Sequence, residues 1–369
     1  MWLRIAEGNF YEAHQQLRVI ASRYLKSQST FANAADILSG GAKALLQAGQ
    51  GGSGGDLALM LVNDVYVKGE WEVNDANRKR LLDVLKDFPR EEPTRKRYVQ
   101  EIVGWSARFG EVEMGDPEIH HVVGEMHAKG WYSSYFLSVN RHLRLRPSFL
   151  SANTNSSLLS ENNPYDAERH LLLGTSQSPN PLSTVLYTWY TADSPHTAPL
   201  YLSRAIFPYL LLGNLSSATK SYQLFTSHLT SSNPTLFTQS VSSSKSDMRV
   251  FPSLPLLNFL GLLLLSCQKG QRSLFTDLAK HYATHLKEKE IGETWGWNDA
   301  LAGIGELWFG IRIPRQMGNP LMDMMGSMFF GGGGANTSGG SSARSGTPKP
   351  AAAQKTVEGP QAPPTMDLD

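Results

Sequence analysis

Apolar residues recur at intervals of three and four along most of residues 3–310, and this spacing restricts the fold more than any other feature of the sequence. Residues with such spacing lie on one face of an α-helix and are buried against a neighbouring element. The first stripe consists of Ala13, Leu17, Ile20, Ala21, Tyr24 and Leu25, and noisier stripes follow in residues 30–48, 56–67, 76–88, 95–109 and 117–128. Alternating runs of Val, Ile and Thr between turn dipeptides are scarce, so the sequence predicts an all-α fold without a large sheet.

Two positions carry signals that start a helix. At Asp116, a capping side chain precedes Pro117, whose missing N–H costs nothing at the first helical position. Asp56 follows a glycine-rich stretch, residues 51–55, and is predicted to cap the next helix after a flexible turn. That stretch lacks the Lys-Ser or Lys-Thr pair that ends a phosphate-binding loop, so it does not predict a nucleotide site.

A degenerate internal repeat starts several of these helices. Residues 8–13 place a turn residue before a small Ala13, and a large Leu17 follows one turn later. Residues 163–171 and 213–222 repeat this arrangement. Helical hairpins of this kind bury their faces only by stacking on their neighbours, which predicts a helical-repeat solenoid. The copies are unevenly spaced, and coincidence between short, common patterns is the alternative explanation.

Three segments interrupt the helical periodicity. Residues 130–161 are rich in Ser, Arg, Leu and Asn, and we expect a loop or disorder there. Residues 230–247 form a Ser/Thr-rich loop in this interpretation, followed by a short strand at residues 248–252. From Gly331 onward the chain consists mainly of Gly, Ser, Ala and Pro, which predicts a disordered tail.

The charge balance and the single cysteine limit the partners and the compartment. The 34 basic residues nearly cancel the 33 acidic ones, so the chain has no strong field for nucleic acid or anionic lipid. Cys267 has no second cysteine to pair with, which fits a reducing compartment. The start of the chain lacks a signal-peptide pattern, and the most apolar run, residues 254–265, is shorter than the ~18 residues of a membrane span. We therefore expect a cytosolic protein that does not insert into membranes.

A series of motifs, each short and common on its own, occurs in a specific order. They are residues 8–15, 21–24, 50–57, 115–117 with His120, 165–170, 173–175, 257–260, 262–265, 267–268 and 309–316. In this order they resemble the Golgi to ER traffic protein 4 family. The resemblance covers residues 3–330 apart from an insertion at residues 130–161.

The resemblance implies a fold and a function. Members of the family are all-α, tetratricopeptide-like helical-repeat solenoids with a small β-hairpin near the C-terminal end. The N-terminal half, residues 1–129 here, docks the dimeric ATPase that targets tail-anchored proteins. The C-terminal half, residues 162–330, holds the N-terminal segment of a ubiquitin-like protein, which recruits a glutamine-rich co-chaperone carrying the client. The resemblance thus implies a non-enzymatic adaptor without a cofactor. Residues 331–369, the tail predicted from composition to be disordered, lie beyond the resemblance.

Two features depart from the family pattern. Seven residues precede the motif at Gly8, where family members usually carry a longer lead-in helix, and residues 130–161 replace a short turn. A faulty gene model, with a missed first exon and an intron read as coding, would account for both, and sequencing the transcript would decide. The alternative is a tolerated surface-loop insertion, because closure entropy grows slowly with loop length. In either case we expect no function in residues 130–161.

The resemblance suggests one pair of charged residues for the ATPase. Lys26 and Asp56 match charged family positions that contact it. Solvated charges of this kind steer a partner and make association sensitive to salt. Helix capping and solubility explain both residues equally well from the sequence alone.

A groove for the ubiquitin-like partner is expected near the hairpin. Residues 248–251 resemble the family's hairpin strand and residues 256–265 the helix behind it, and a partner segment docks into such apolar surfaces. The residues chosen to line the groove are Phe251, Leu257, Leu260, Trp308 and Phe309. Core packing is the alternative for each of them, because a helix that is apolar all round is normally buried.

Two further clusters have other interpretations. His120, His121, Glu125 and His127 are of metal-ligand types, but they fall on different helix faces, so ordinary surface and core roles are favoured. Residues 321–330 are rich in Met and apolar, and a chaperone-like grip on hydrophobic client segments there is the rival function. A helical enzyme is the second rival, which predicts convergent titratable groups in a concave pocket.

Overall fold

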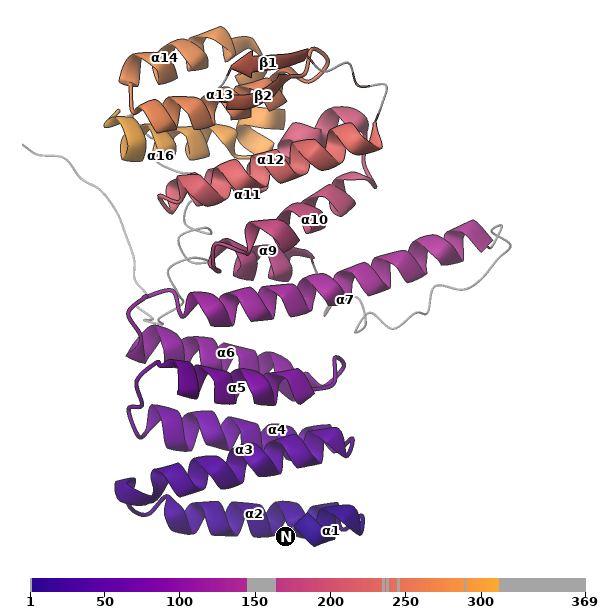
Figure 1. The fold of residues 1–369 in the computed structure, drawn as a ribbon, viewed down its shortest axis with the longest axis vertical. Helices are drawn as coiled ribbons and strands as arrows, with labels where there is room; N and C mark the ends of the chain where they lie inside the picture. The colour runs from indigo at the N-terminus through magenta and orange to yellow at the C-terminus, as the bar shows by residue number, and fades with distance from the viewer. Residues whose placement is uncertain are drawn as a thin grey trace, which may run out of the picture. The chain divides into compact units, whose positions relative to one another are not determined.

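The computed structural model describes residues 2–144, 164–233, 236, 239–243, 246–288 and 290–311, and helices make up most of them (Figure 1). The first elements are α1 (Trp2–Ala6), α2 (Phe10–Tyr24), η1 (Gln28–Thr30), α3 (Phe31–Gln47), α4 (Gly51–Met60), η2 (Leu61–Val67), α5 (Asp75–Asp87), α6 (Pro93–Phe109) and α7 (Pro117–Arg144). The later helices are α9 (Pro164–Leu172), α10 (Pro179–Tyr190), η3 (Pro195–Thr197), α11 (Ala198–Leu211), α12 (Leu215–Ser232), α13 (Pro255–Lys269), α14 (Arg272–His281), α15 (Ala283–Leu286), η4 (Glu290–Thr294) and α16 (Trp297–Phe309).

One small sheet interrupts the helices in the described part of the chain. Strands β1 (Gln239–Ser243) and β2 (Ser246–Val250) pair antiparallel, with Gln239 opposite Val250 and Ser243 opposite Ser246. The hairpin lies between α12 and α13, near the C-terminal end of the described residues (Figure 1). The predicted all-α helical-repeat fold with a small C-terminal hairpin is therefore confirmed.

The N-terminal helices form two layers. From α2 to α7, each helix packs against the next but one in the chain, and α2, α3, α5 and α6 also pack against the helix that follows them. Helices α2, α4 and α6 therefore lie side by side in one layer, and α3, α5 and α7 lie in the other. Figure 1 shows these helices stacked in chain order from α2 to α7. A residue on the outer face of α4 and one on the outer face of α5 consequently belong to opposite surfaces.

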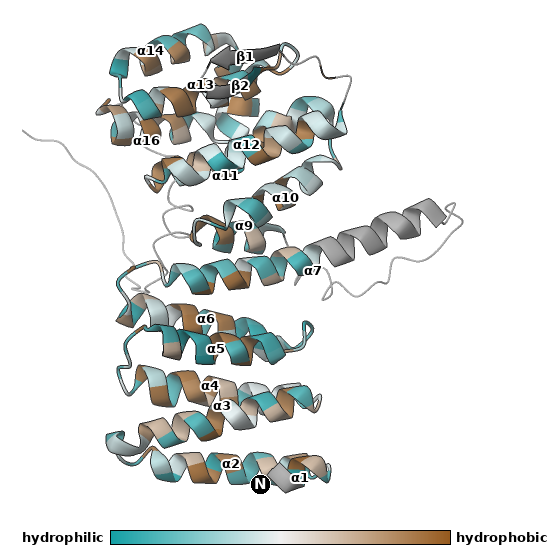
Figure 2. Ribbon diagram, in the orientation of Figure 1, coloured by the Kyte–Doolittle hydropathy of each residue, from teal (hydrophilic) through white to brown (hydrophobic). Residues whose placement is uncertain are grey.

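Two separate apolar cores support the array. The first extends from Leu17 on α2 to Val123 on α7, and the second from Ala128 on α7 to Phe309 on α16. Figure 2 shows how apolar and polar residues alternate along the helices that enclose these cores. Helix α7 contributes its first turns to one core and later turns to the other, so it is the element that joins the two halves.

Helix α7 is longer than the sequence analysis suggested. We expected a loop from residue 130, but the helix continues as far as Arg144. The side chain of Trp131 is buried in the second core, and no proline occurs between Pro117 and Pro147 to break the helix. Residues 145–163 and 312–369, which include the rest of the insertion, the Met-rich stretch and the tail, lie outside the described residues.

The glycine-rich stretch is helical, which corrects the prediction of a flexible turn. Helix α4 begins at Gly51, so Asp56 lies inside the helix and does not cap it. A Cβ at Gly54 would lie 2.6 Å from Cγ of Leu46 on α3, and a Cβ at Gly55 would collide with Thr94 on α6. The glycines are therefore present because α3 and α6 approach the α4 backbone closely.

The predicted cap at Asp116 is present. Its Oδ1 accepts hydrogen bonds from the backbone N–H groups of Glu118 and Ile119 at 2.9 and 3.0 Å. Its Oδ2 accepts one from Nη1 of Arg78 on α5 at 2.7 Å, so the cap also ties α7 to α5. No helix in the described ranges combines the length and the apolar composition that a membrane span requires.

Candidate protein-interaction sites

Asp56 lies on α4 and is held by two side chains of α2. Its Oδ2 accepts hydrogen bonds from Nε2 of His14 at 2.9 Å and from Nη1 of Arg18 at 2.8 Å. His14 and Arg18 are four residues apart, so they share the face of α2 that contacts α4. The Asp56 side chain is 42% exposed and that of Arg18 46% exposed. The result is a fixed, solvent-facing charge cluster, which we call the α2–α4 charge cluster.

Lys26 is not part of that cluster. It is exposed in the turn between α2 and η1, after the C-terminal end of the helix that carries Arg18. Among the described residues it forms no ion pair with Asp56, whose carboxylate is bound by Arg18 instead. The role of Asp56 and Lys26 in binding the ATPase stays a prediction, and His14 and Arg18, which bind the Asp56 carboxylate, were not predicted from the sequence. Their spacing of four on one helix was the available signal.

Three of the residues chosen for the C-terminal groove are core residues, which corrects that prediction. The side chains of Phe251, Leu257 and Leu260 are each 0% exposed, so they offer no atoms to a partner. The side-chain amide of Asn258 explains the arrangement. Its Oδ1 accepts from the Phe251 N–H at 2.8 Å, and its Nδ2 donates to the Phe251 carbonyl at 2.9 Å. This pair of hydrogen bonds turns the chain from β2 into α13 and directs Phe251 inward.

The two candidates on α16 differ from each other. Phe309 is buried, and its ring stacks on that of Phe275 with centroids 4.7 Å apart. Trp308 is half-buried, and its Nε1 donates to the carbonyl of Leu210 at 2.8 Å. Of the five predicted groove residues, Trp308 alone keeps appreciable exposed surface.

A pocket of about 210 Å³ lies elsewhere on the C-terminal half. Its wall is formed by η3 and the start of α11, by the segment that leads from β2 into the start of α13, and by residues 285–291 of α15 and η4. Apolar lining comes from Pro199, Leu200, Leu254, Pro255, Leu256 and Ile291, and polar groups from His196, Thr197, Ser253, His285, Glu288 and Glu290. The volume suits one or two apolar side chains of a partner, and the two carboxylates favour basic neighbours. Sequence reasoning missed this pocket because three distant segments form it.

The histidines of α7 are engaged with α9 and α10. Nε2 of His120 donates to the Met114 carbonyl at 2.9 Å, so the neutral ring has an unprotonated Nδ1. That Nδ1 accepts a hydrogen bond from Nδ1 of His170 at 2.9 Å. Burial lowers the pKa of His120 and lowers that of His170 further, and the charge of Arg169 acts in the same direction. His121 contacts Oγ of Ser178 at 2.9 Å. These contacts join α7 to the second half of the array.

Comparison with known proteins agrees with the ordered motifs and with the fold. A family model described as Golgi to ER traffic protein 4 matches residues 28–329. The Golgi to ER traffic protein 4 of Aspergillus fumigatus is 50% identical over 99% of this chain and 96% of its own length. The protein of that name from Schizosaccharomyces pombe is 32% identical over 89% of this chain and 95% of its own.

A solved structure supports the same assignment. The crystal structure of C. therm. Get4 matches with a TM-score of 0.72 at 43% identity, covering 90% of this chain and 94% of that chain. The likeness therefore extends over both halves of the array. The chain belongs to the Golgi to ER traffic protein 4 family, which implies a role in the GET pathway.

Proposed function

We propose that this protein is a non-enzymatic cytosolic adaptor for the delivery of tail-anchored proteins to the ER. Its N-terminal half docks the targeting ATPase, and its C-terminal half holds the N-terminal segment of a ubiquitin-like protein, which brings the glutamine-rich co-chaperone and its client. The observation that carries the proposal is that the α2–α4 charge cluster and the C-terminal pocket belong to different apolar cores. Two partners on one framework raise the effective concentration of client near the ATPase.

The α2–α4 charge cluster suits reversible docking. Arg18 and His14 fix the orientation of the Asp56 carboxylate, so a partner does not have to order it. No described residue hydrogen-bonds to Oδ1 of Asp56, which leaves that oxygen for a basic group of the ATPase. Lys26 extends the charged surface beyond the end of α2. Exposed charges of this kind favour fast, salt-sensitive association.

The C-terminal pocket suits an apolar anchor residue. A segment that inserts a Leu or Phe between Leu200 and Leu256, with Lys or Arg beside it, would complement the wall and the carboxylates of Glu288 and Glu290. In this proposal Phe251, Leu257 and Leu260, which belong to the same apolar core as Leu254 of the pocket wall, do not touch the partner.

Calorimetric titration of the full-length chain with each partner tests the proposal. Asp56→Lys or Lys26→Glu should weaken ATPase binding at least about tenfold and leave binding of the ubiquitin-like segment unchanged. Leu256→Asp should do the reverse. Leu262→Asp is the matched control, because Leu262 is 38% exposed on the same helix and does not line the pocket.

The outcome separates the adaptor from its rival. If both partners bind and each variant affects one of them, the adaptor function is supported. If neither partner binds a folded sample, but a free transmembrane peptide does, the chaperone-like function replaces it.

A further inference from the structure

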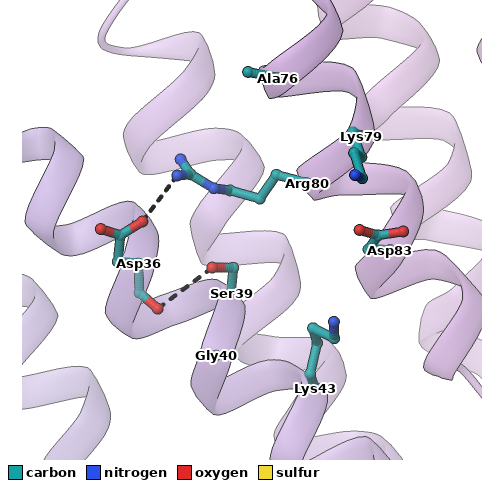
Figure 3. Close-up of a pocket in the computed structure, with 8 residues that line it drawn as sticks. All are labelled: Asp36, Ser39, Gly40, Lys43, Ala76, Lys79, Arg80 and Asp83. Atoms are coloured by element: carbon teal, nitrogen blue, oxygen red, sulfur yellow. Dashed lines mark hydrogen bonds and ion pairs between the residues drawn. The ribbon is translucent and has the colours of Figure 1, made fainter.

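A second charged depression lies on the other layer of the N-terminal half. It has a volume of about 500 Å³ and is open to solvent between α3 and α5 (Figure 3). The lining residues are Asp36, Ser39, Gly40 and Lys43 from α3, and Ala76, Lys79, Arg80 and Asp83 from α5. We call it the α3–α5 groove.

The groove and the α2–α4 charge cluster lie on opposite surfaces. Helices α2 and α4 belong to one layer of the array, and α3 and α5 belong to the other. The residues of the cluster, His14, Arg18 and Asp56, do not line the groove. A protein docked on the α2–α4 charge cluster therefore leaves the α3–α5 groove accessible.

Small residues produce the hollow. Ser39, Gly40 and Ala76 have short side chains or none, whereas longer charged side chains flank them. Figure 3 shows Arg80 reaching across the groove to Asp36, with Lys43 and Lys79 entering from opposite walls on the side of Asp83. The groove thus combines a shallow floor with charged walls, and its volume accommodates several side chains of a partner.

Positively charged side chains outnumber the carboxylates that line the groove. Both carboxylates are already paired within the chain, because Asp36 accepts from Nη2 of Arg80 at 2.8 Å and Asp83 binds Nζ of Lys86 at 3.0 Å. Within the described residues, Lys43 and Lys79 form no ion pair. Two ammonium groups therefore line the groove without a carboxylate partner among the described residues, and a ligand that brings carboxylates would satisfy both.

We propose that the α3–α5 groove is a docking site for an acidic segment of a partner protein, separate from the surface proposed for the ATPase. Carboxylates of the segment pair with Lys43 and Lys79. The methylene groups of its glutamates lie on Gly40 and Ala76. The fixed Arg80–Asp36 pair closes one end of the groove and sets the position of the segment.

Binding of a probe to the full-length chain tests this site. The probe is a labelled peptide of glutamate and glycine, followed by fluorescence anisotropy over a salt series. Lys43→Glu with Lys79→Glu should weaken binding at least about tenfold, since two charge pairs become repulsive. The control, Lys96→Glu with Lys269→Glu, makes the same change in net charge at two exposed lysines outside the groove and should change affinity less than about twofold.

Two further measurements separate shape from net charge and locate the contact. Ala76→Trp fills the groove without a charge change at an exposed helix position, and it should also weaken binding. Zero-length carbodiimide coupling joins carboxylates to amines in contact, so mass spectrometry should find the peptide on Lys43 and Lys79.

The results overturn the proposal in three ways. They do so if the groove variant and the control lose affinity equally, if coupling concentrates on lysines elsewhere, or if the folded chain does not bind the peptide at low salt. Binding of the ATPase is the independent readout. It should be the same in the Lys43→Glu, Lys79→Glu variant as in the unaltered protein, and a loss there would make the groove part of the ATPase surface.

Discussion

The glycines of α4 give a prediction in which the same chemical change should have opposite effects two residues apart. Both Gly52 and Gly54 have helical backbones in α4. At Gly52 an added Cβ meets nothing within 4 Å. At Gly54 it would lie 2.6 Å from Cγ of Leu46 and 3.0 Å from the backbone oxygen of Ala42. Gly52→Ala should therefore stabilise the protein, and Gly54→Ala should destabilise it.

The magnitude follows from two opposing effects. Replacing glycine by alanine in a helix stabilises it by roughly 0.5–1 kcal/mol, because the unfolded chain loses conformational freedom. This gain is nearly the same at Gly52 and Gly54, so it cancels when the variants are compared. Overpacking costs about 1–3 kcal/mol, and it cannot be avoided at Gly54, because the Ala42 oxygen is part of the α3 backbone. The two variants should differ in local stability by about 1–3 kcal/mol.

Hydrogen exchange read by mass spectrometry measures this difference where it arises. Peptides from α3 and α4 should exchange more slowly in Gly52→Ala and faster in Gly54→Ala than in the unaltered protein. Peptides from α13 serve as an internal control, because this helix belongs to the other core. Equal protection in the two variants would refute the close packing of α3 on α4.

Two further predictions concern buried polar contacts of α9. The free energy of unfolding should fall as the pH drops below 6.5, which is the ordinary pKa of a histidine. The fall should reach up to about 1.4 kcal/mol per pH unit for each of His120 and His170. Because the pKa of His120 and that of His170 are lowered in the folded protein, the unfolded chain binds protons first as the pH falls. Denaturant titrations at several pH values should show a weaker pH dependence of the unfolding free energy in a variant with both His120→Gln and His170→Gln. Glu168→Ala should cost about 3 kcal/mol in a urea titration, since it leaves the Arg204 guanidinium without its carboxylate. If Glu168→Ala loses no more unfolding free energy than the double variant Glu168→Ala, Arg204→Ala does, the unpaired charge of Arg204 is not the cause.

Local sequence signals located most helices and one of the caps. The stripe from Ala13 to Leu25 and the Asp116-Pro117 cap depend on neighbours within one or two turns, so the sequence contains all the necessary information. Glycine was the exception. Residues 51–55 have a low intrinsic helix preference, yet they form the start of α4, where α3 and α6 lie too close for a Cβ at Gly54 or Gly55.

The candidate sites were predicted less completely than the fold. Asp56 was identified by its likeness to a family position, but its partners His14 and Arg18 come from another helix. Exposure was misjudged for Phe251 and Leu257, because an apolar residue beside a hairpin has the same sequence pattern in a core and in a groove. The pocket near Leu256 combines three segments far apart in the chain, and no local pattern marks it.

The sequence by itself determined the helical class, the order of the helices and the family, since periodicity, caps and ordered motifs are properties of the chain. The tertiary structure decided which charged side chains meet, which leucines have exposed surface, and on which layer each site lies. The physical reason is that burial and ion pairing depend on distances between separate helices. Those distances follow from packing, and residues such as Gly54 show that packing in turn overrides local preference.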